Sequence, residues 1–256
     1  MKLGFLGTGN ITSDVISGIC KSSLKFKQIV ISPRNRIKAN KLRKKFRKVY
    51  IAKNNQEVLN KSDWVFIGLL PKVAEKILPE LEFKKNHTVV SFVATLNFST
   101  LKKIINNKKT LVRAIPMPPI SLGLGPVVMY PPNKKVKNFF NKVGKSIEIK
   151  NEKQSNNFWA ISGTMATFYE TLKVLSDWLV KKKVNRTKSQ EYITSLYFAL
   201  AGLALENSRN SLKKFVADSQ TPGGLNWQGV NYLRKSGYYK SLENSLNNLL
   251  KRLNKS

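Results

Sequence analysis

Cysteine and histidine are almost absent from this sequence. Its 256 residues include one cysteine, Cys20, and one histidine, His87. A single cysteine excludes a disulfide framework within the chain and leaves no basis for a metal cluster, so we expect no bound metal. This usage is typical of a reducing compartment, and we interpret Cys20 as a buried bystander.

Long apolar runs are also missing. The first apolar stretch, which begins at Leu3, is broken by Gly7-Thr8-Gly9, too early for the apolar core of a signal peptide. No later run approaches the roughly 20 residues that a membrane span requires. We therefore expect a cytoplasmic protein with no membrane partner.

Acidic residues are scarce. The chain has 14 Asp and Glu against 46 Lys and Arg, a formal net charge of +32. Such a charge fits a nucleic acid or an acidic membrane surface as partner. The basic residues, however, are spread along the whole chain in short runs such as 181–183, with no recognised nucleic-acid-binding motif. We favour a compositional bias and expect no nucleic-acid partner; a basic nucleic-acid or membrane-surface protein is the less favoured alternative.

Two kinds of apolar pattern divide the chain. Up to residue 151, short continuous apolar runs such as 29–31 and 64–67 alternate with amphipathic stretches such as 11–20. Continuous runs predict strands covered on both faces, and the stretches between them predict crossover helices. We therefore expect an α/β fold with a Rossmann-like, doubly wound, mostly parallel sheet over residues 1–151.

The second pattern, over residues 152–256, is helical. Apolar side chains recur at helical spacing at Ile193, Leu196, Leu200 and Leu203, and again from Leu242 to Leu253, with no convincing strand pattern. Helical domains with such apolar stripes often bury them against a second copy. We expect an all-helical dimerisation domain and a homodimer or larger homo-oligomer.

A glycine turn follows the first predicted strand. The sequence Gly7-Thr8-Gly9-Asn10-Ile11 leads into a predicted helix; Gly7 allows a tight turn, and Gly9 lets the backbone approach a pyrophosphate. The amides that begin the helix offer free donors to the phosphates. Thr12 stands where a third glycine is usual. The pattern predicts a dinucleotide site at these residues, and the alternative is a glycine turn with no ligand.

The end of the second predicted strand carries no acid. An NAD-binding protein usually places a carboxylate there for the adenosine ribose, whereas this chain has Ser32-Pro33-Arg34-Asn35-Arg36. Ser32 can donate a hydrogen bond, and Arg34 a fork of donors, to a ribose phosphate, and Asn35 adjoins them. We therefore expect NADP(H) as the cofactor. The alternative is that Arg34 and Arg36 begin a solvated basic helix.

A series of further motifs runs along nearly the whole chain: GFLGTGNI at the start, SPRN at 32–35, Asn55-Gln56-Glu57, VFIGLLP at 65–71, VVSFVA at 89–94, RAIPMPP at 113–119, Ser162-Gly163 and TPGG at 221–224. In this order the motifs resemble those of pyrroline-5-carboxylate reductases, the family that catalyses the last step of proline synthesis. The resemblance implies a dinucleotide-binding domain followed by a helical domain that interlocks with a partner.

The resemblance also implies further site residues. It places Asn55, Leu69, Leu70, Val93 and Ala94 in the cofactor groove, and a substrate site at the dimer interface. A glycine turn before a helix supplies free amides to an anion such as the substrate carboxylate, although an ordinary turn between helices is the alternative. The substrate-binding residues would be Ser162, Thr221, Gly223, Gly224, Leu225 and Asn226, of which Ser162, Thr221 and Asn226 are the catalytic candidates.

Around the substrate, several motifs depart from the family pattern. The family's S-G-S-G-P-A-Y reads S-G-T-M-A-T-F at 162–168, its M-P-N-T-P reads I-P-M-P-P at 115–119, and Asn226 replaces a threonine. The cofactor motifs match the family better than the substrate motifs do.

Together these observations predict an enzyme, an oxidoreductase that uses NADPH to reduce a cyclic imine, 1-pyrroline-5-carboxylate, to L-proline. The protein's main task is then positioning, because the hydride comes from the cofactor. The alternative is a paralogue with the same fold and cofactor that reduces another imine or ketone. We interpret His87 as a strand-edge residue rather than a proton donor.

Overall fold

The computed structural model of the chain describes residues 1–105 and 110–254. It divides into two compact units, Met1–Ser155 and Asn156–Ser256. The strands all lie in the first unit: β1 (Lys2–Leu6), β2 (Gln28–Ile31), β3 (Val49–Ile51), β4 (Trp64–Ile67), β5 (Thr88–Ser91), β6 (Thr110–Pro116), β7 (Pro126–Tyr130) and β8 (Lys145–Glu148).

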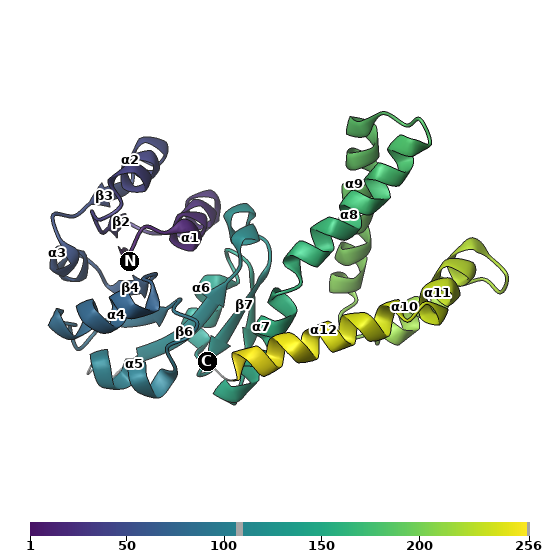
Figure 1. Ribbon diagram of the computed structural model, residues 1–256. Helices are drawn as coiled ribbons and strands as arrows, with labels where there is room; N and C mark the ends of the chain where they lie inside the picture. Colours follow the sequence, from purple (N-terminus) through teal and green to yellow (C-terminus); the bar gives the residue numbers. More distant parts are fainter. Residues whose placement is uncertain (106–109, 255–256) are drawn as a thin grey trace. The chain divides into compact units, whose positions relative to one another are not determined.

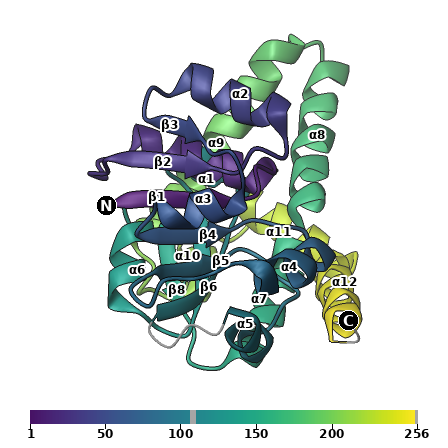
Figure 2. The same ribbon diagram turned by 90° about the vertical axis from the view of Figure 1, so that its left-hand side faces the viewer.

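These strands form one sheet in the order β3-β2-β1-β4-β5-β6-β7-β8. Figure 2 shows the first five of them, from β3 to β5, one below the other. Every neighbouring pair is parallel except β6 and β7. The order of the first six strands is that of a doubly wound dinucleotide-binding sheet, so the predicted α/β fold is confirmed. The strands predicted from the sequence do not include β3, whose three residues show little pattern, or β7, although residues 127–130 of β7 form a continuous apolar run.

Helices cover both faces of this sheet (Figure 1). Consecutive strand residues point to opposite faces of the sheet. Phe5 and Phe66 therefore stack in one core layer, with their ring centroids 4.6 Å apart, and Leu6 and Ile67 lie in the other layer. Helices α1 (Asn10–Lys21), α2 (Arg36–Lys45) and α6 (Lys134–Phe140) contribute to the first layer, and α3 (Asn55–Asn60), α4 (Pro71–Ile77) and α5 (Phe98–Ile105) to the second. Short 3-10 turns complete the unit: η1 (Leu78–Glu80), η2 (Pro118–Leu122) and η3 (Glu152–Gln154).

The second unit is helical where the structure describes it, as expected. Of its described residues, only two hydrophobic side chains, Ala160 and Ile193, are buried. Leu200 and Leu203, on the same apolar stripe as Ile193, are 54% and 56% exposed, so the residues that the structure describes leave this part of the stripe uncovered. The helices are α7 (Ser155–Ser162), α8 (Met165–Lys181), α9 (Arg186–Glu206), α10 (Leu212–Asp218), α11 (Leu225–Lys235) and α12 (Tyr238–Leu253).

None of the helices between residues 1 and 254, the gap at 106–109 aside, is both long enough and apolar enough to cross a bilayer.

Candidate functional site

A cleft of about 940 Å³ lies in the first unit, at the carboxyl ends of β1 to β4. In a parallel sheet these ends share one edge, and the strand order reverses between β1 and β4, which is where such folds bind ligands. The predicted cofactor residues that line this cleft are Gly7, Thr8, Gly9, Asn10, Ile11, Ser32, Arg34, Asn35, Asn55, Leu69 and Leu70.

The glycine turn has the geometry that a close phosphate contact needs. Gly7 adopts φ +92°, and a Cβ there would lie 2.4 Å from the carbonyl oxygen of Gly68, so only glycine fits. Its amide donates to Oγ of the buried Ser32 at 2.8 Å, which anchors the turn to the end of β2. At Gly9 an added Cβ would meet no protein atom within 4 Å, so the space beside its backbone is open.

Helix α1 begins directly after this turn with unsatisfied donors. Gly9 is its N-cap and has no side chain to accept from the first-turn amides, which have no partner inside a helix. The hydroxyl oxygens of Thr8 and Thr12 are buried without a hydrogen-bond partner among the described residues. The free amides and the unpaired hydroxyl of Thr8, which lines the cleft, fit the pyrophosphate of a dinucleotide, whereas Thr12 does not line the cleft.

The missing third glycine has a structural explanation. Thr12 is fully buried, and a Cβ on Gly68, the first residue after β4, would lie 2.1 Å from its hydroxyl oxygen. Gly68 therefore provides the room that a glycine at position 12 would otherwise provide. Sequence reasoning did not single out Gly68, because the contact joins residues far apart in the chain.

The rim at the end of β2 is basic. Arg34 and Arg36 are exposed and line the cleft, and no acid stands among its lining residues. Asn35 caps α2 by accepting from the Lys38 amide at 3.1 Å, and the Lys38 ammonium bonds the Asn10 side chain. A basic rim without a carboxylate suits a ribose 2′-phosphate. Arg36, like Phe92 on the opposite side of the cleft, was not among the predicted cofactor residues.

Two predicted cofactor residues, Val93 and Ala94, are not among the lining residues of the cleft, although their neighbour Phe92 is. They lie in the loop between β5 and α5. Val93 donates its amide to Oγ of Ser91 at 3.2 Å, and the Ala94 carbonyl accepts from the Arg113 guanidinium at 2.5 Å. Their place in the cofactor groove stays a prediction.

His87 lies just before β5 and is buried. The Lys84 amide donates to Nδ1 at 3.1 Å, so Nε2 carries the hydrogen and donates to the Leu59 carbonyl at 3.1 Å. Burial, and to a smaller extent the Lys84 charge, lowers the pKa of His87. The contacts make His87 a neutral residue that joins the loop before β5 to α3, outside the lining of the cleft.

The predicted substrate residues lie in the second unit at two places along the chain. Ser162 ends α7 and donates its hydroxyl to the Phe158 carbonyl at 3.1 Å. The turn before α11 is closed by the Gly224 amide and the Thr221 carbonyl at 2.8 Å, with Gly223 at φ +74°. Gly224 is the N-cap of α11 and has no side chain, Leu225 is 86% exposed, and Asn226 donates to the Ser219 carbonyl at 3.0 Å.

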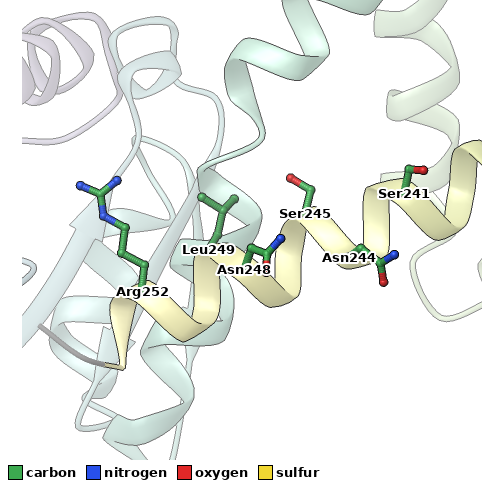
Figure 3. A pocket seen from close by; sticks show the side chains of 6 residues that line it. All are labelled: Ser241, Asn244, Ser245, Asn248, Leu249 and Arg252. Atoms are coloured by element: carbon green, nitrogen blue, oxygen red, sulfur yellow. The ribbon is translucent and has the colours of Figure 1, made fainter.

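Two hollows in the second unit are lined by other residues. One, of about 530 Å³, runs along a single face of α12 from Ser241 to Arg252 (Figure 3). The second, of about 320 Å³, lies between α8 and α9, where Asp177 pairs with Arg186 at 3.1 Å. Neither is lined by Ser162 or by the turn before α11, so the described cavities of this unit do not assemble the predicted substrate site.

Two family models match the sequence. Residues 2–95 match the model described as NADP oxidoreductase, coenzyme F420-dependent, and residues 152–256 match that for pyrroline-5-carboxylate reductase dimerisation. Pyrroline-5-carboxylate reductase 3 of Danio rerio is 26% identical over 249 residues, covering 93% of this chain and 85% of the relative. The pyrroline-5-carboxylate reductase of Haemophilus influenzae is 21% identical over 263 residues, covering 98% and 95%.

Solved structures show the same fold. A pyrroline-5-carboxylate reductase from Coxiella burnetii is 20% identical with a TM-score of 0.85, and that from Plasmodium falciparum, with NADP bound, is 21% identical with a TM-score of 0.81. In both cases the match covers 99% of this chain and 97% of the other. The chain thus combines an NADP oxidoreductase domain with a pyrroline-5-carboxylate reductase dimerisation domain, and its relatives over nearly the full length are pyrroline-5-carboxylate reductases. The chain belongs to the pyrroline-5-carboxylate reductase family.

Proposed function

We propose that this protein uses NADPH to reduce 1-pyrroline-5-carboxylate to L-proline. The observation that carries the proposal is the cleft of the first unit, with its glycine turn, its uncapped helix and its basic rim. Membership of the family adds the substrate, because the relatives over the full length are named pyrroline-5-carboxylate reductases.

The lining of the cleft indicates which end would receive each half of the cofactor. Residues 7–11 would hold the pyrophosphate with backbone amides, and Arg34, with Arg36 beside it, would hold the 2′-phosphate at the end of β2. The two halves of such a sheet each receive one nucleotide. With the adenosine half over β1 to β3, the nicotinamide half extends toward the ends of β4 and β5, where Leu69, Leu70 and Phe92 provide an apolar lining.

Chemically, the bound cofactor would supply a hydride to the imine carbon, while the ring nitrogen takes up a proton. The chain's own residues would orient the two reactants. Ser162, Thr221 and Asn226 are the proposed contacts of the substrate carboxylate and nitrogen, and the amides of Leu225 and Asn226 in the uncapped first turn of α11 would add donors.

A second copy of the chain would complete the helical unit. Its described residues include many exposed large hydrophobic side chains, Leu200, Leu203 and Trp178 among them, around two buried ones. Exposed apolar area of this extent is typical of protein interfaces, and the matching family model is that of a dimerisation domain. A homodimer is therefore the expected assembly, and a monomer in analytical ultracentrifugation at micromolar concentration would contradict it.

The decisive assay follows NADPH absorbance after addition of 1-pyrroline-5-carboxylate to the purified protein. Oxidation of NADPH with formation of proline is expected. NADPH binding without turnover would instead favour a paralogue for another imine or ketone, which the residues Met117, Met165 and Asn226 would then explain. If the protein does not bind NADPH but binds DNA with an affinity that falls steeply with salt, the proposal is overturned.

A further inference from the structure

Arg113 is a buried charge on β6, an interior strand of the sheet. It is 4% exposed, and its register partners are Ser91 at the end of β5 and Tyr130 in β7. Because β5 and β6 are parallel, the level of Ser91 is the carboxyl edge of the sheet, the edge at which the cofactor cleft lies. A guanidinium in such a place is costly unless its donors are paired.

The guanidinium connects three segments of the first unit. One of its nitrogens, Nη2, donates to the Ala94 carbonyl in the loop after β5 at 2.5 Å, and Nη1 pairs with the carboxylate of Glu152 in η3. The same carboxylate oxygen accepts from the Phe98 amide, at the start of α5, at 2.7 Å. Glu152 thus binds the guanidinium and also the Phe98 amide, just after the end of the loop. Arg113 binds the middle of the same loop, at the Ala94 carbonyl.

This loop, residues 92–97, adjoins the half of the cleft that would receive nicotinamide. Its first residue, Phe92, lines the cleft, and Val93 is tied to Ser91. The Arg113 bond is a second tie and sets the direction of the Ala94 carbonyl, because a peptide plane fixed at its oxygen is also fixed at the following amide. Neither Arg113 nor Glu152 lines the cleft, so any influence on a ligand passes through the loop.

We propose that Arg113 is a positioning residue for the nicotinamide half of the cofactor, with Glu152 as the counter-ion that holds its guanidinium in place. The inference rests on the proposed function, since it presumes that NADPH occupies the cleft. An arginine suits the task because its planar fork reaches the carbonyl and the carboxylate together, whereas the ammonium of a lysine is a single point of charge.

The experiment compares two ligands that differ in the nicotinamide half. NADPH and 2′,5′-ADP share the phosphorylated adenosine, but 2′,5′-ADP lacks nicotinamide. For R113M we expect NADPH affinity to fall about tenfold and kcat to fall by about ten- to a hundredfold, as small misplacements near reacting groups do. Affinity for 2′,5′-ADP should change less than about twofold, because its contacts lie over β1 to β3.

Two conservative variants and one control complete the design. R113K and E152Q should lie between wild type and R113M, and they replace R113M if thermal melting shows that it does not fold. K137M removes another ion pair of the same unit, between Lys137 and Glu148 at 2.7 Å, and should leave both affinities unchanged. If the role of Arg113 were merely structural, the melting temperature would change in R113M and K137M alike. The affinities of R113M for NADPH and for 2′,5′-ADP would then not differ in their response.

The outcomes are distinct. If folded R113M or R113K binds both ligands as wild type does, with unchanged kcat, or loses both equally, the inference is overturned while the proposed function stands. If wild-type protein binds neither ligand, the proposed function fails, and the inference fails with it.

Discussion

Replacing Gly9 by alanine should weaken NADPH binding and leave the fold intact. Gly9 has φ −71° and ψ −176°, an ordinary extended conformation, and an added Cβ would meet no protein atom within 4 Å. The folded chain therefore accepts the methyl group without strain. A glycine-to-alanine change at such a site stabilises a protein by about 0.4–1 kcal/mol, because the unfolded chain loses conformational freedom.

The cofactor should feel the same methyl group. It would occupy the space beside the backbone that the pyrophosphate is proposed to enter. Overfilling a closely packed contact costs about 1–3 kcal/mol, which corresponds to a rise in Kd of about fivefold to more than a hundredfold.

Gly7 provides the contrasting variant from the same turn. Its φ of +92° is in the region that side chains rarely adopt, and its Cβ would lie 2.4 Å from the Gly68 carbonyl oxygen. The conformation alone costs about 1–2 kcal/mol, and relief of the overlap requires β1 and β4 to move apart. Gly7→Ala should therefore lower the free energy of unfolding, whereas Gly9→Ala should not.

The assay pairs a urea titration with a fluorescence titration of NADPH for wild type, Gly9→Ala and Gly7→Ala. The expected result is unchanged or raised stability with weak NADPH binding for Gly9→Ala, and loss of stability for Gly7→Ala. Unchanged NADPH affinity in Gly9→Ala would refute the reasoning, since the backbone of the turn would then not approach the cofactor closely.

Three further predictions concern charge and protonation. Arg34→Asp should weaken NADPH more than tenfold relative to NADH, through loss of a charge-assisted bond of about 1.5–3 kcal/mol; Arg47→Asp makes the same charge change outside the cleft and should not. Because the pKa of His87 is lowered by burial from its usual 6.5, the unfolded chain gains a proton first as pH falls below that value. The free energy of unfolding should then decrease in acid, and urea titrations should show a smaller decrease in His87→Gln. Cys20 is partly buried rather than fully buried as expected, and this burial raises the pKa of its thiol to about 11, so iodoacetamide at neutral pH should label the native protein slowly and the urea-unfolded protein fast; fast native labelling would contradict the raised pKa.

Much of the first unit was predictable because its signals are local. A continuous apolar run, a glycine turn and an amphipathic stretch follow one another within residues 2–21, and each has a direct physical meaning for the backbone. The same holds for Ser32 to Arg36, where the absence of an acid separates NADP from NAD. β3 escaped prediction because three residues show little pattern of their own, whereas the continuous apolar run at 127–130 made β7 predictable; the pairing of both strands is decided by their neighbours in the sheet.

The sequence by itself therefore determined the class of fold, the two-part organisation and the position of the cofactor turn, since these depend on residues adjacent in the chain. Only the tertiary structure decided how Thr12 is accommodated and what a buried Arg113 does. Gly68 makes room for the Thr12 side chain, and Ala94 and Glu152 bind the Arg113 guanidinium. Such contacts join distant residues that the order of the strands brings to one edge of the sheet, and no local pattern encodes that order.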